Sequence, residues 1–97
     1  MSNNKRLVVL GRDAGDIDRL TRILEGAGYI VTSTANDGVA IDLVGSSTYD
    51  AMLITRDVPE NDRRYVATQS RDRDEGLPVL TVNSARSVLT QLTQALP

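Results

Sequence analysis

Short apolar runs alternate with stretches of helical spacing along the chain, and this alternation most constrains its fold. The first run, Leu7–Leu10, consists entirely of β-prone residues, as expected for a strand buried on both faces of a parallel sheet. A helix starting at Asp13 or Gly15 should follow, because apolar residues then recur three and four positions apart and form one face. That face comprises Ile17, Leu20, Ile23, Leu24 and Ala27, and the glycines at 26 and 28 should end the helix.

The same alternation continues to the end of the sequence. It predicts three further strands, which are Tyr29–Thr34, Ala51–Thr55 and Pro78–Val82. Asn36-Asp37-Gly38 should cap a second helix that ends near Gly45, with Val39, Ala40, Leu43 and Val44 on its inner side. A weak polar helix is expected at Arg63–Ser70. Ser84 should cap a last helix with an inner stripe of Ala85, Val88, Leu89, Leu92 and Leu96.

Strands alternating with helices predict right-handed βαβ units, a parallel sheet and helices on both of its faces. At 97 residues the chain should form a single α/β domain spanning 1–97 with a modest core. Phe and Trp are absent, so this core must be built from aliphatic side chains.

Composition also excludes several kinds of chemistry. The chain has no Cys and no His, which excludes disulfides and argues against zinc or other soft-metal sites, so that only a hard ion such as Mg²⁺ remains. A net charge of −2 argues against direct nucleic-acid binding. The sequence contains no apolar run of membrane-spanning length, and we expect a cytoplasmic protein without membrane contact.

Several short motifs, taken in order, resemble a response-regulator receiver domain (CheY-like). They are Leu7–Leu10, the Gly28-Tyr29 pair, Asn36-Asp37-Gly38 with Ala40, Tyr49-Asp50 with Pro59, and Arg71 with Leu77-Pro78-Val79. The resemblance covers most of the chain. It implies a flavodoxin-like, doubly wound parallel sheet, shortened to four strands in the order 2-1-3-4, and a role in two-component phosphorelay signalling.

The sequence departs from this family where the family's chemistry resides. Thr55 occupies the position of the phosphoaccepting aspartate, and Gly11 and Arg12 occupy the two acidic, Mg²⁺-binding positions. Asp13 could replace one of these acids if the register shifts by one residue. Asn83 takes the place of the hydroxyl residue after the fourth strand. The family's catalytic lysine has no counterpart, since Lys5 is the only lysine.

These departures predict a site without phosphotransfer, without a cofactor and without enzymatic activity. A threonine hydroxyl is a weak nucleophile without a neighbouring base, and losing two carboxylates removes most of a Mg²⁺ site. One hypothesis makes Arg12 a built-in substitute for the ion, paired with Asp13 or Asp57; the alternative extends Arg12 into solvent. Asp57 is either a displaced acceptor or a loop carboxylate that serves as a cap or pairs with Arg56. We favour the loop carboxylate, because two extended residues span about 6–7 Å.

Relative to a full receiver, the usual fourth helix and fifth strand are missing. The last helix should therefore cross to the face of the first helix, where apolar strand surface remains to be covered. The fourth strand becomes an edge, which favours a homodimer through that edge or through the apolar surface that the missing elements would have covered. The alternative is that side chains and the last helix shield the edge.

Three functions of different classes remain open. The first is a phosphorylation-independent pseudo-receiver that binds a protein partner, such as a kinase, another regulator or itself. The second is a receiver with an atypical phosphoacceptor. The third is a small anion- or nucleotide-binding domain, in which the turn from Gly11 to Gly15 at a helix start would hold the anion.

Overall fold

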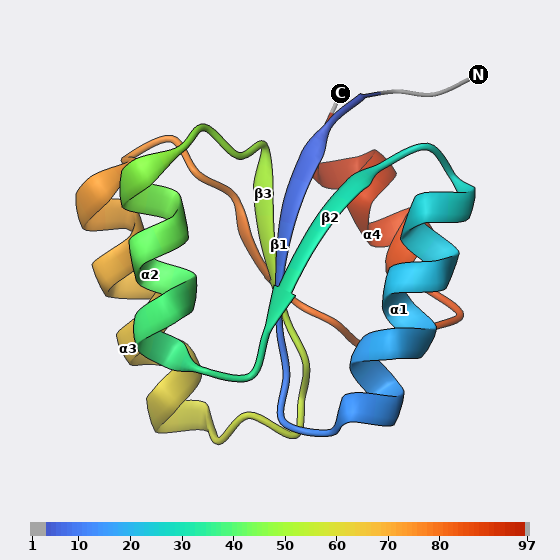
Figure 1. Cartoon of the computed structure of the whole chain (residues 1–97), viewed down its shortest axis with the longest axis horizontal. Coiled ribbons are helices and arrows are strands. Elements are labelled where there is room, and N and C mark those ends of the chain that lie inside the picture. Colours follow the sequence, from blue (N-terminus) through green and yellow to red (C-terminus); the bar gives the residue numbers. More distant parts are fainter. Residues whose placement is uncertain (1–3, 97) are drawn as a thin grey trace.

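A computed structural model describes residues 4–96 and contains a four-stranded, fully parallel sheet (Figure 1). The strands are β1 (Arg6–Leu10), β2 (Ile30–Thr34), β3 (Ala51–Ile54) and β4 (Val79–Thr81). Their order is β2-β1-β3-β4, as the sequence predicts, and every neighbouring pair is parallel. The predicted flavodoxin-like α/β fold is therefore confirmed.

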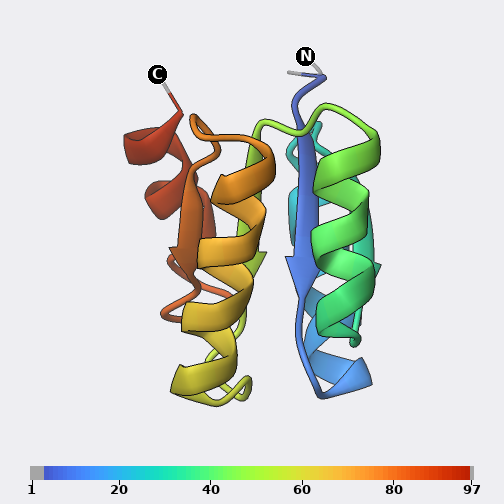
Figure 2. The same ribbon diagram turned by 90° about the vertical axis from the view of Figure 1, so that its left-hand side faces the viewer.

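Among residues 4–96, four helices cover the sheet, two on each face. They are α1 (Ala14–Gly26), α2 (Asp37–Ser46), α3 (Glu60–Arg73) and α4 (Val88–Ala95). Helices α1 and α4 lie on one face, and α2 and α3 lie on the other, as Figures 1 and 2 show. The predicted crossing of the last helix to the face of the first is confirmed, because buried side chains of α1 and α4 share one cluster.

The sheet separates two mainly aliphatic clusters, one of which also contains the buried Tyr49, and alternate residues of β1 belong to each. Val8 and Leu10 pack beneath α2 and α3, whereas Leu7 and Val9 pack beneath α1 and α4. All four side chains are fully buried. This burial on both faces explains why β1 reads as an unbroken apolar run rather than as an alternating one.

Two predicted helix starts are confirmed in their details. Asp13 is the N-cap of α1, and its side chain accepts a hydrogen bond from the Gly15 N–H. Asn36 caps α2 by accepting from the Val39 N–H at 3.0 Å. Both caps follow the carboxyl end of a strand, so they also fix the loops that carry the candidate site.

The third and fourth helices differ from the prediction. Helix α3 begins at Glu60 and ends at Arg73, because Pro59 and the acidic residues Glu60 and Asp62 favour a helix start that apolar spacing does not reveal. Helix α4 begins at Val88, four residues after Ser84, whose hydroxyl instead accepts from the Ser87 N–H in the preceding turn.

Two residues assigned to inner helix faces are exposed in the structure. Val39 is 45% exposed and Leu89 is 37% exposed, so both predictions were wrong. In α2 the buried side is formed by Ala40, Ile41 and Val44. Apolar residues of α2 occur on more than one side of the helix, so the sequence does not show which side faces the sheet.

Helix α4 covers part of the edge formed by β4. The Gln91 side chain donates to the Thr81 carbonyl at 2.9 Å and accepts from the Asn83 N–H at 3.1 Å. The opposite side of the strand bonds to β3, as in the Val82 N–H to Ile54 carbonyl contact of 2.9 Å. A side-chain amide thus occupies two of the backbone groups that an added strand would need. None of the helices within residues 4–96 is long and apolar enough to cross a membrane.

Candidate functional site

The candidate site lies where the carboxyl ends of the strands meet, the usual place for sites in parallel α/β sheets. Gly11, Arg12 and Asp13 follow β1, Thr55 and Asp57 follow β3, and the end of β4 leads to Asn83. The Thr55 N–H donates to the Leu10 carbonyl at 2.9 Å, which fixes the two central loops relative to each other.

Asp57 turns back toward the sheet instead of extending away from it. A turn closed by the Val58 N–H to Thr55 carbonyl bond brings the Asp57 carboxylate to the hydroxyl of Thr55, which donates to it. The same carboxylate accepts from the Asp13 N–H at 2.8 Å and from the Arg12 N–H at 3.3 Å. The expected position of Asp57 away from the site was wrong, because it assumed an extended chain. The carboxylate caps backbone N–H groups of the loop after β1 rather than pairing with Arg56.

These contacts favour the ionised form of Asp57. The hydrogen bond from Thr55, followed by those from the Asp13 and Arg12 N–H groups, lowers the pKa of the Asp57 carboxyl below its ordinary value. The first turn of the loop after β1 therefore binds an anion, and that anion belongs to the chain itself.

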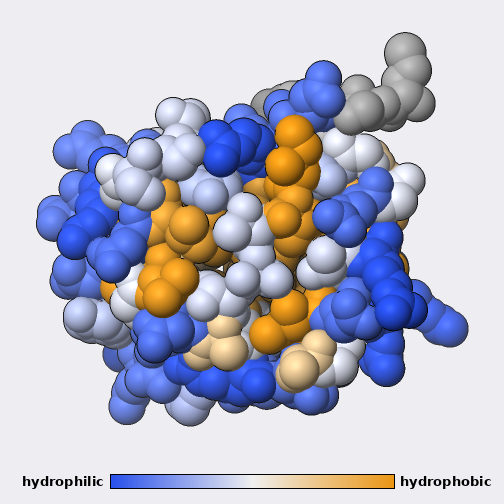
Figure 3. All heavy atoms as spheres, in the orientation of Figure 1, coloured by the Kyte–Doolittle hydropathy of each residue, from blue (hydrophilic) through white to orange (hydrophobic). Residues whose placement is uncertain are grey.

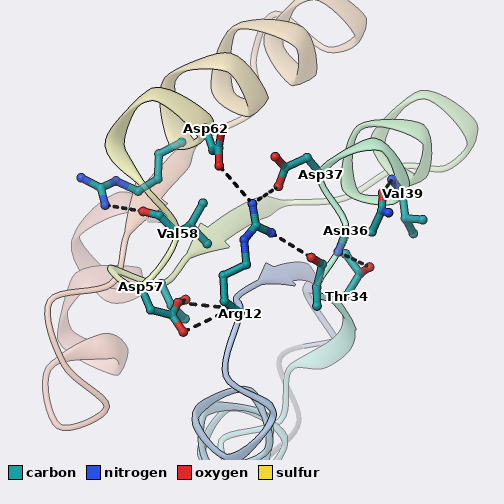
Figure 4. Close-up of polar contacts among 11 residues, drawn as sticks. Arg12, Thr34, Asn36, Asp37, Val39, Asp57, Val58 and Asp62 are labelled. Carbon is teal, nitrogen blue, oxygen red and sulfur yellow. Dashed lines mark hydrogen bonds and ion pairs between the residues drawn. The ribbon is translucent and has the colours of Figure 1, made fainter.

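Arg12 crosses the site and holds two carboxylates on the opposite side (Figure 4). Its guanidinium donates to Asp37 at 2.7 Å and to Asp62 at 3.4 Å, and it also donates to the Ala35 carbonyl at 2.8 Å. Hydrogen bonding to Asp37 raises the pKa of Arg12 further above its high ordinary value. Arg12 does form an internal ion pair, but with Asp37 and Asp62 rather than with the predicted Asp13 or Asp57.

Gly11 lies against Thr55 and leaves no room for a side chain. A Cβ atom at this position would lie 2.9 Å from Thr55 Oγ1 and 2.9 Å from Ile17 Cγ1. Thr55 itself is only 6% exposed. The acidic residue that the family resemblance implies at Gly11 is therefore incompatible with this arrangement of Thr55 and α1.

Asn83 pairs with Arg56 rather than with Asp57. Its side-chain oxygen accepts from Arg56 at 2.6 Å, and both residues line a hollow of about 240 Å³. Thr55, Asp57, Arg19 and Asp16 contribute to the same wall. The hollow thus carries two arginines and two carboxylates, which gives it no net charge.

The residues present do not fit the Mg²⁺ ion of receiver domains. Within residues 4–96, no group of three or more His, Cys, Asp or Glu side chains is placed to hold a metal ion. Both oxygens of Asp57 face hydrogen-bond donors of this chain, and the Arg12 guanidinium lies between Asp37 and Asp62. Lys5 lies at the other end of the sheet, where its carbonyl accepts from the Ile30 N–H.

The sequence reading missed several residues of the site. Asp37 was recognised only as part of a cap, although the residue after β2 must lie at the same sheet edge as the residue after β1. Asp62 was missed because the predicted third helix begins only at Arg63. Arg63 was missed as well; it donates to the Val58 carbonyl at 2.7 Å and holds the loop that carries Asp57.

Comparisons with known proteins relate the chain to part of a response regulator by sequence and to a phosphotransferase-system domain by fold. No protein-family model matches the chain. The chain is 33% identical over 84 residues to the response regulator MprA of Mycobacterium avium (strain 104), a match covering 86% of this chain and 36% of that protein. MprA of Mycolicibacterium paratuberculosis matches to the same extent. The chain thus spans little more than a third of the length of these curated relatives.

A solved structure has the same fold at low sequence identity. It is the lactose-specific IIB component domain of the phosphoenolpyruvate:carbohydrate phosphotransferase system from Streptococcus pneumoniae, with a TM-score of 0.71. The match covers 98% of this chain and 100% of that domain at 15% identity, so it concerns the fold alone. The chain therefore has a flavodoxin-like α/β fold, and its sequence is receiver-like in its similarity to part of a response regulator.

Proposed function

We propose that this chain is a receiver-like signalling module of the two-component type that binds a protein partner without being phosphorylated. In this proposal the module is not an enzyme, needs no cofactor and acts in the cytoplasm. Its partner is a kinase, another regulator or a second copy of itself, and neither nucleic acid nor membrane takes part directly.

One observation carries this proposal: the charges of the site are already neutralised inside the chain. Phosphoryl transfer requires an accessible nucleophile and cations that offset the charge on the transferring oxygens. Here the Asp57 carboxylate accepts from Thr55, Arg12 and Asp13, while the Arg12 guanidinium is held by Asp37 and Asp62. A phosphodonor would have to displace the donors that hold Asp57, and the Arg12 guanidinium is already bound by Asp37 and Asp62.

Phosphodonor treatment tests the proposal directly. The chain is incubated with acetyl phosphate and Mg²⁺, and its intact mass is measured, with a receiver that keeps the usual aspartate as the positive control. We expect no phosphoryl adduct on this chain under conditions that modify the control. An adduct on any residue would contradict phosphorylation independence.

A second candidate function makes Asp57 an atypical phosphoacceptor. It is favoured by the position of the carboxylate at the end of β3, within hydrogen-bonding distance of Thr55, and by its lowered pKa. An Asp57 oxygen would attack the phosphorus of acetyl phosphate, and acetate would leave. If an adduct forms and Asp57→Asn abolishes it, this candidate replaces the first.

The third candidate, anion binding, is favoured by the N–H groups of Arg12 and Asp13, which already hold a carboxylate. An external phosphate would have to compete with Asp57 for them. Thermal unfolding in millimolar phosphate or ATP tests this candidate: a rise in melting temperature that grows in Asp57→Asn supports it, and no rise in either protein excludes it.

A further inference from the structure

We propose that the β2 edge of the sheet forms an interface with a second copy of this chain, in which the two β2 strands pair antiparallel about a twofold axis. The inference builds on the proposed interaction module by naming its partner and surface. It moves the expected contact from the β4 edge to the opposite edge of the sheet.

The two edges of the described sheet differ in what they offer to another strand. At β4, which is only Val79–Thr81, the Gln91 amide already occupies outward groups of Thr81 and Asn83. At β2, the Ile30 N–H donates to the Lys5 carbonyl at 2.8 Å and the Thr34 carbonyl accepts from the Gly11 N–H at 3.2 Å, and these two partners flank β1. In a parallel ladder the intervening residues Val31 and Ser33 therefore direct their N–H and carbonyl groups outward.

The sequence of β2 lacks the usual protection of an edge strand. Ile30–Thr34 contains no charged residue and no proline, and most of its residues are β-branched. Natural edge strands commonly carry lysine, proline or a bulge to prevent pairing. Two β2 strands can also approach each other without placing like charges opposite one another.

Exposed apolar side chains flank this edge on the α2 side. Ile30 is 49% exposed and Val39 is 45% exposed. Val31 packs against the α1 and α4 cluster, so its neighbour Ile30 points to the opposite face, the side of α2. Figure 3 shows apolar side chains gathered on the face where β2 and α2 lie in Figure 1, between hydrophilic surroundings.

The positions of these two residues fit a twofold axis. Ile30 begins β2, whereas Val39 lies in the first turn of α2, just beyond the other end of the strand. In an antiparallel pair centred on Thr32, Val31 of one copy faces Ser33 of the other, and their outward groups exchange N–H···O bonds. The same symmetry brings Ile30 of each copy toward Val39 of the other, which covers both exposed side chains.

Sedimentation equilibrium over about 5–500 µM tests this arrangement, since a small interface of this kind gives a weak dimer. We expect the wild type to dimerise, and Ile30→Lys and Val39→Glu each to raise the dimer Kd by about tenfold or more. The double variant Ile30→Lys/Val39→Glu should recover most of the affinity, because the lysine of one copy then meets the glutamate of the other. Leu89→Lys, on the exposed side of α4, is the matched control and should leave the Kd unchanged.

A wild-type monomer throughout this range overturns the inference, as does an Ile30→Lys variant that dimerises as well as the wild type. Loss of dimerisation in Leu89→Lys alone would assign the contact to the α4 and β4 side instead. Repeating the measurement with acetyl phosphate separates this inference from the proposed function. A donor-dependent Kd contradicts phosphorylation independence without affecting the assignment of the β2 edge.

Discussion

Replacing Arg12 with alanine tests whether the charge inside the site stabilises the fold. The guanidinium makes two short hydrogen bonds, to Asp37 at 2.7 Å and to the Ala35 carbonyl at 2.8 Å, and a longer one to Asp62. Hydrogen bonds to charged groups contribute about 1.5–3 kcal/mol when buried, whereas exposed ion pairs contribute about 0–1 kcal/mol. The Arg12 and Asp37 side chains are 32% and 25% exposed, so this pair lies between those limits.

We therefore expect Arg12→Ala to lower the free energy of unfolding by about 1–2 kcal/mol. The loss should not reach the roughly 3–5 kcal/mol of a broken buried pair, because water can reach Asp37 and Asp62 after truncation. Arg12→Lys should lose more than half as much, since an ammonium group cannot donate to Asp37 and the Ala35 carbonyl with the fixed fork of a guanidinium.

Urea denaturation followed by circular dichroism measures these differences, at about 0.05 M and about 1 M NaCl. Arg22→Ala is the matched control, because Arg22 pairs with Asp18 at 3.0 Å while 80% of its side chain is exposed. The control should change stability by less than about 0.5 kcal/mol. The claim that Arg12 stabilises the fold through its pairs with Asp37 and Asp62 is refuted if Arg12→Ala changes stability no more than this control does. It is also refuted if 1 M NaCl removes the loss of stability entirely.

Three further predictions concern the neighbouring residues and the core. Asp57→Asn should cost about 1 kcal/mol near pH 7, discounted for the exposure of the carboxylate. Because the pKa of Asp57 is lowered in the folded state, the extra stability of the wild type over Asp57→Asn is present above about pH 4 and is lost as the pH falls through the folded pKa. Urea denaturation at pH values from 6 to 3 measures this, and a difference in free energy of unfolding that stays constant with pH would contradict it. Gly11→Ala should lower the free energy of unfolding by about 1–3 kcal/mol, because the new methyl group would clash with Thr55. In a double-mutant cycle, the Gly11→Ala/Thr55→Ala variant should lose less stability than the sum of the two single variants, and strictly additive losses would argue against the contact. Ser70→Ala should be neutral or stabilising by up to about 0.5 kcal/mol in thermal melts, because the buried hydroxyl donates only to Met52 Sδ at 3.8 Å and alanine is the better helix former; a clear loss of stability would show that this weak bond matters.

The fold was predictable because the strands are short, apolar and separated by recognisable caps. The order 2-1-3-4 is the one that the receiver resemblance implies, and the placement of α4 follows from the need to cover apolar sheet surface. The site was only half predictable. From their positions in the sequence, Gly11, Arg12, Thr55 and Asp57 could be predicted to lie at one edge of the sheet. The turn that directs the Asp57 carboxylate inward could not be predicted.

The choice of partners within the site depends on side-chain reach rather than on sequence spacing. Arg12 is long enough to bypass Asp13 and reach Asp37 and Asp62, which lie 25 and 50 residues further along the chain. Such a contact leaves no periodic signal, and a single sequence does not reveal which of several carboxylates lies nearest. The same holds for Gln91, whose amide pairs with the backbone next to β4.

The uniformly apolar sequence of β1 leaves its alignment with β3 to be decided at the two ends of the strand. Leu7–Leu10 would suit the interior equally well if β1 slid by one residue, although every side chain would then change face. At one end, Arg6 and Asp50 prevent this shift, since the Arg6 N–H donates to the Asp50 carboxylate and the Asp50 N–H donates to the Arg6 carbonyl, both at 2.7 Å. At the other end, only a residue without a Cβ fits against Thr55, and only Gly11 meets that requirement. Contacts at both ends of β1 therefore select its register, and the contact at Gly11 is the one that depends on the absence of a side chain.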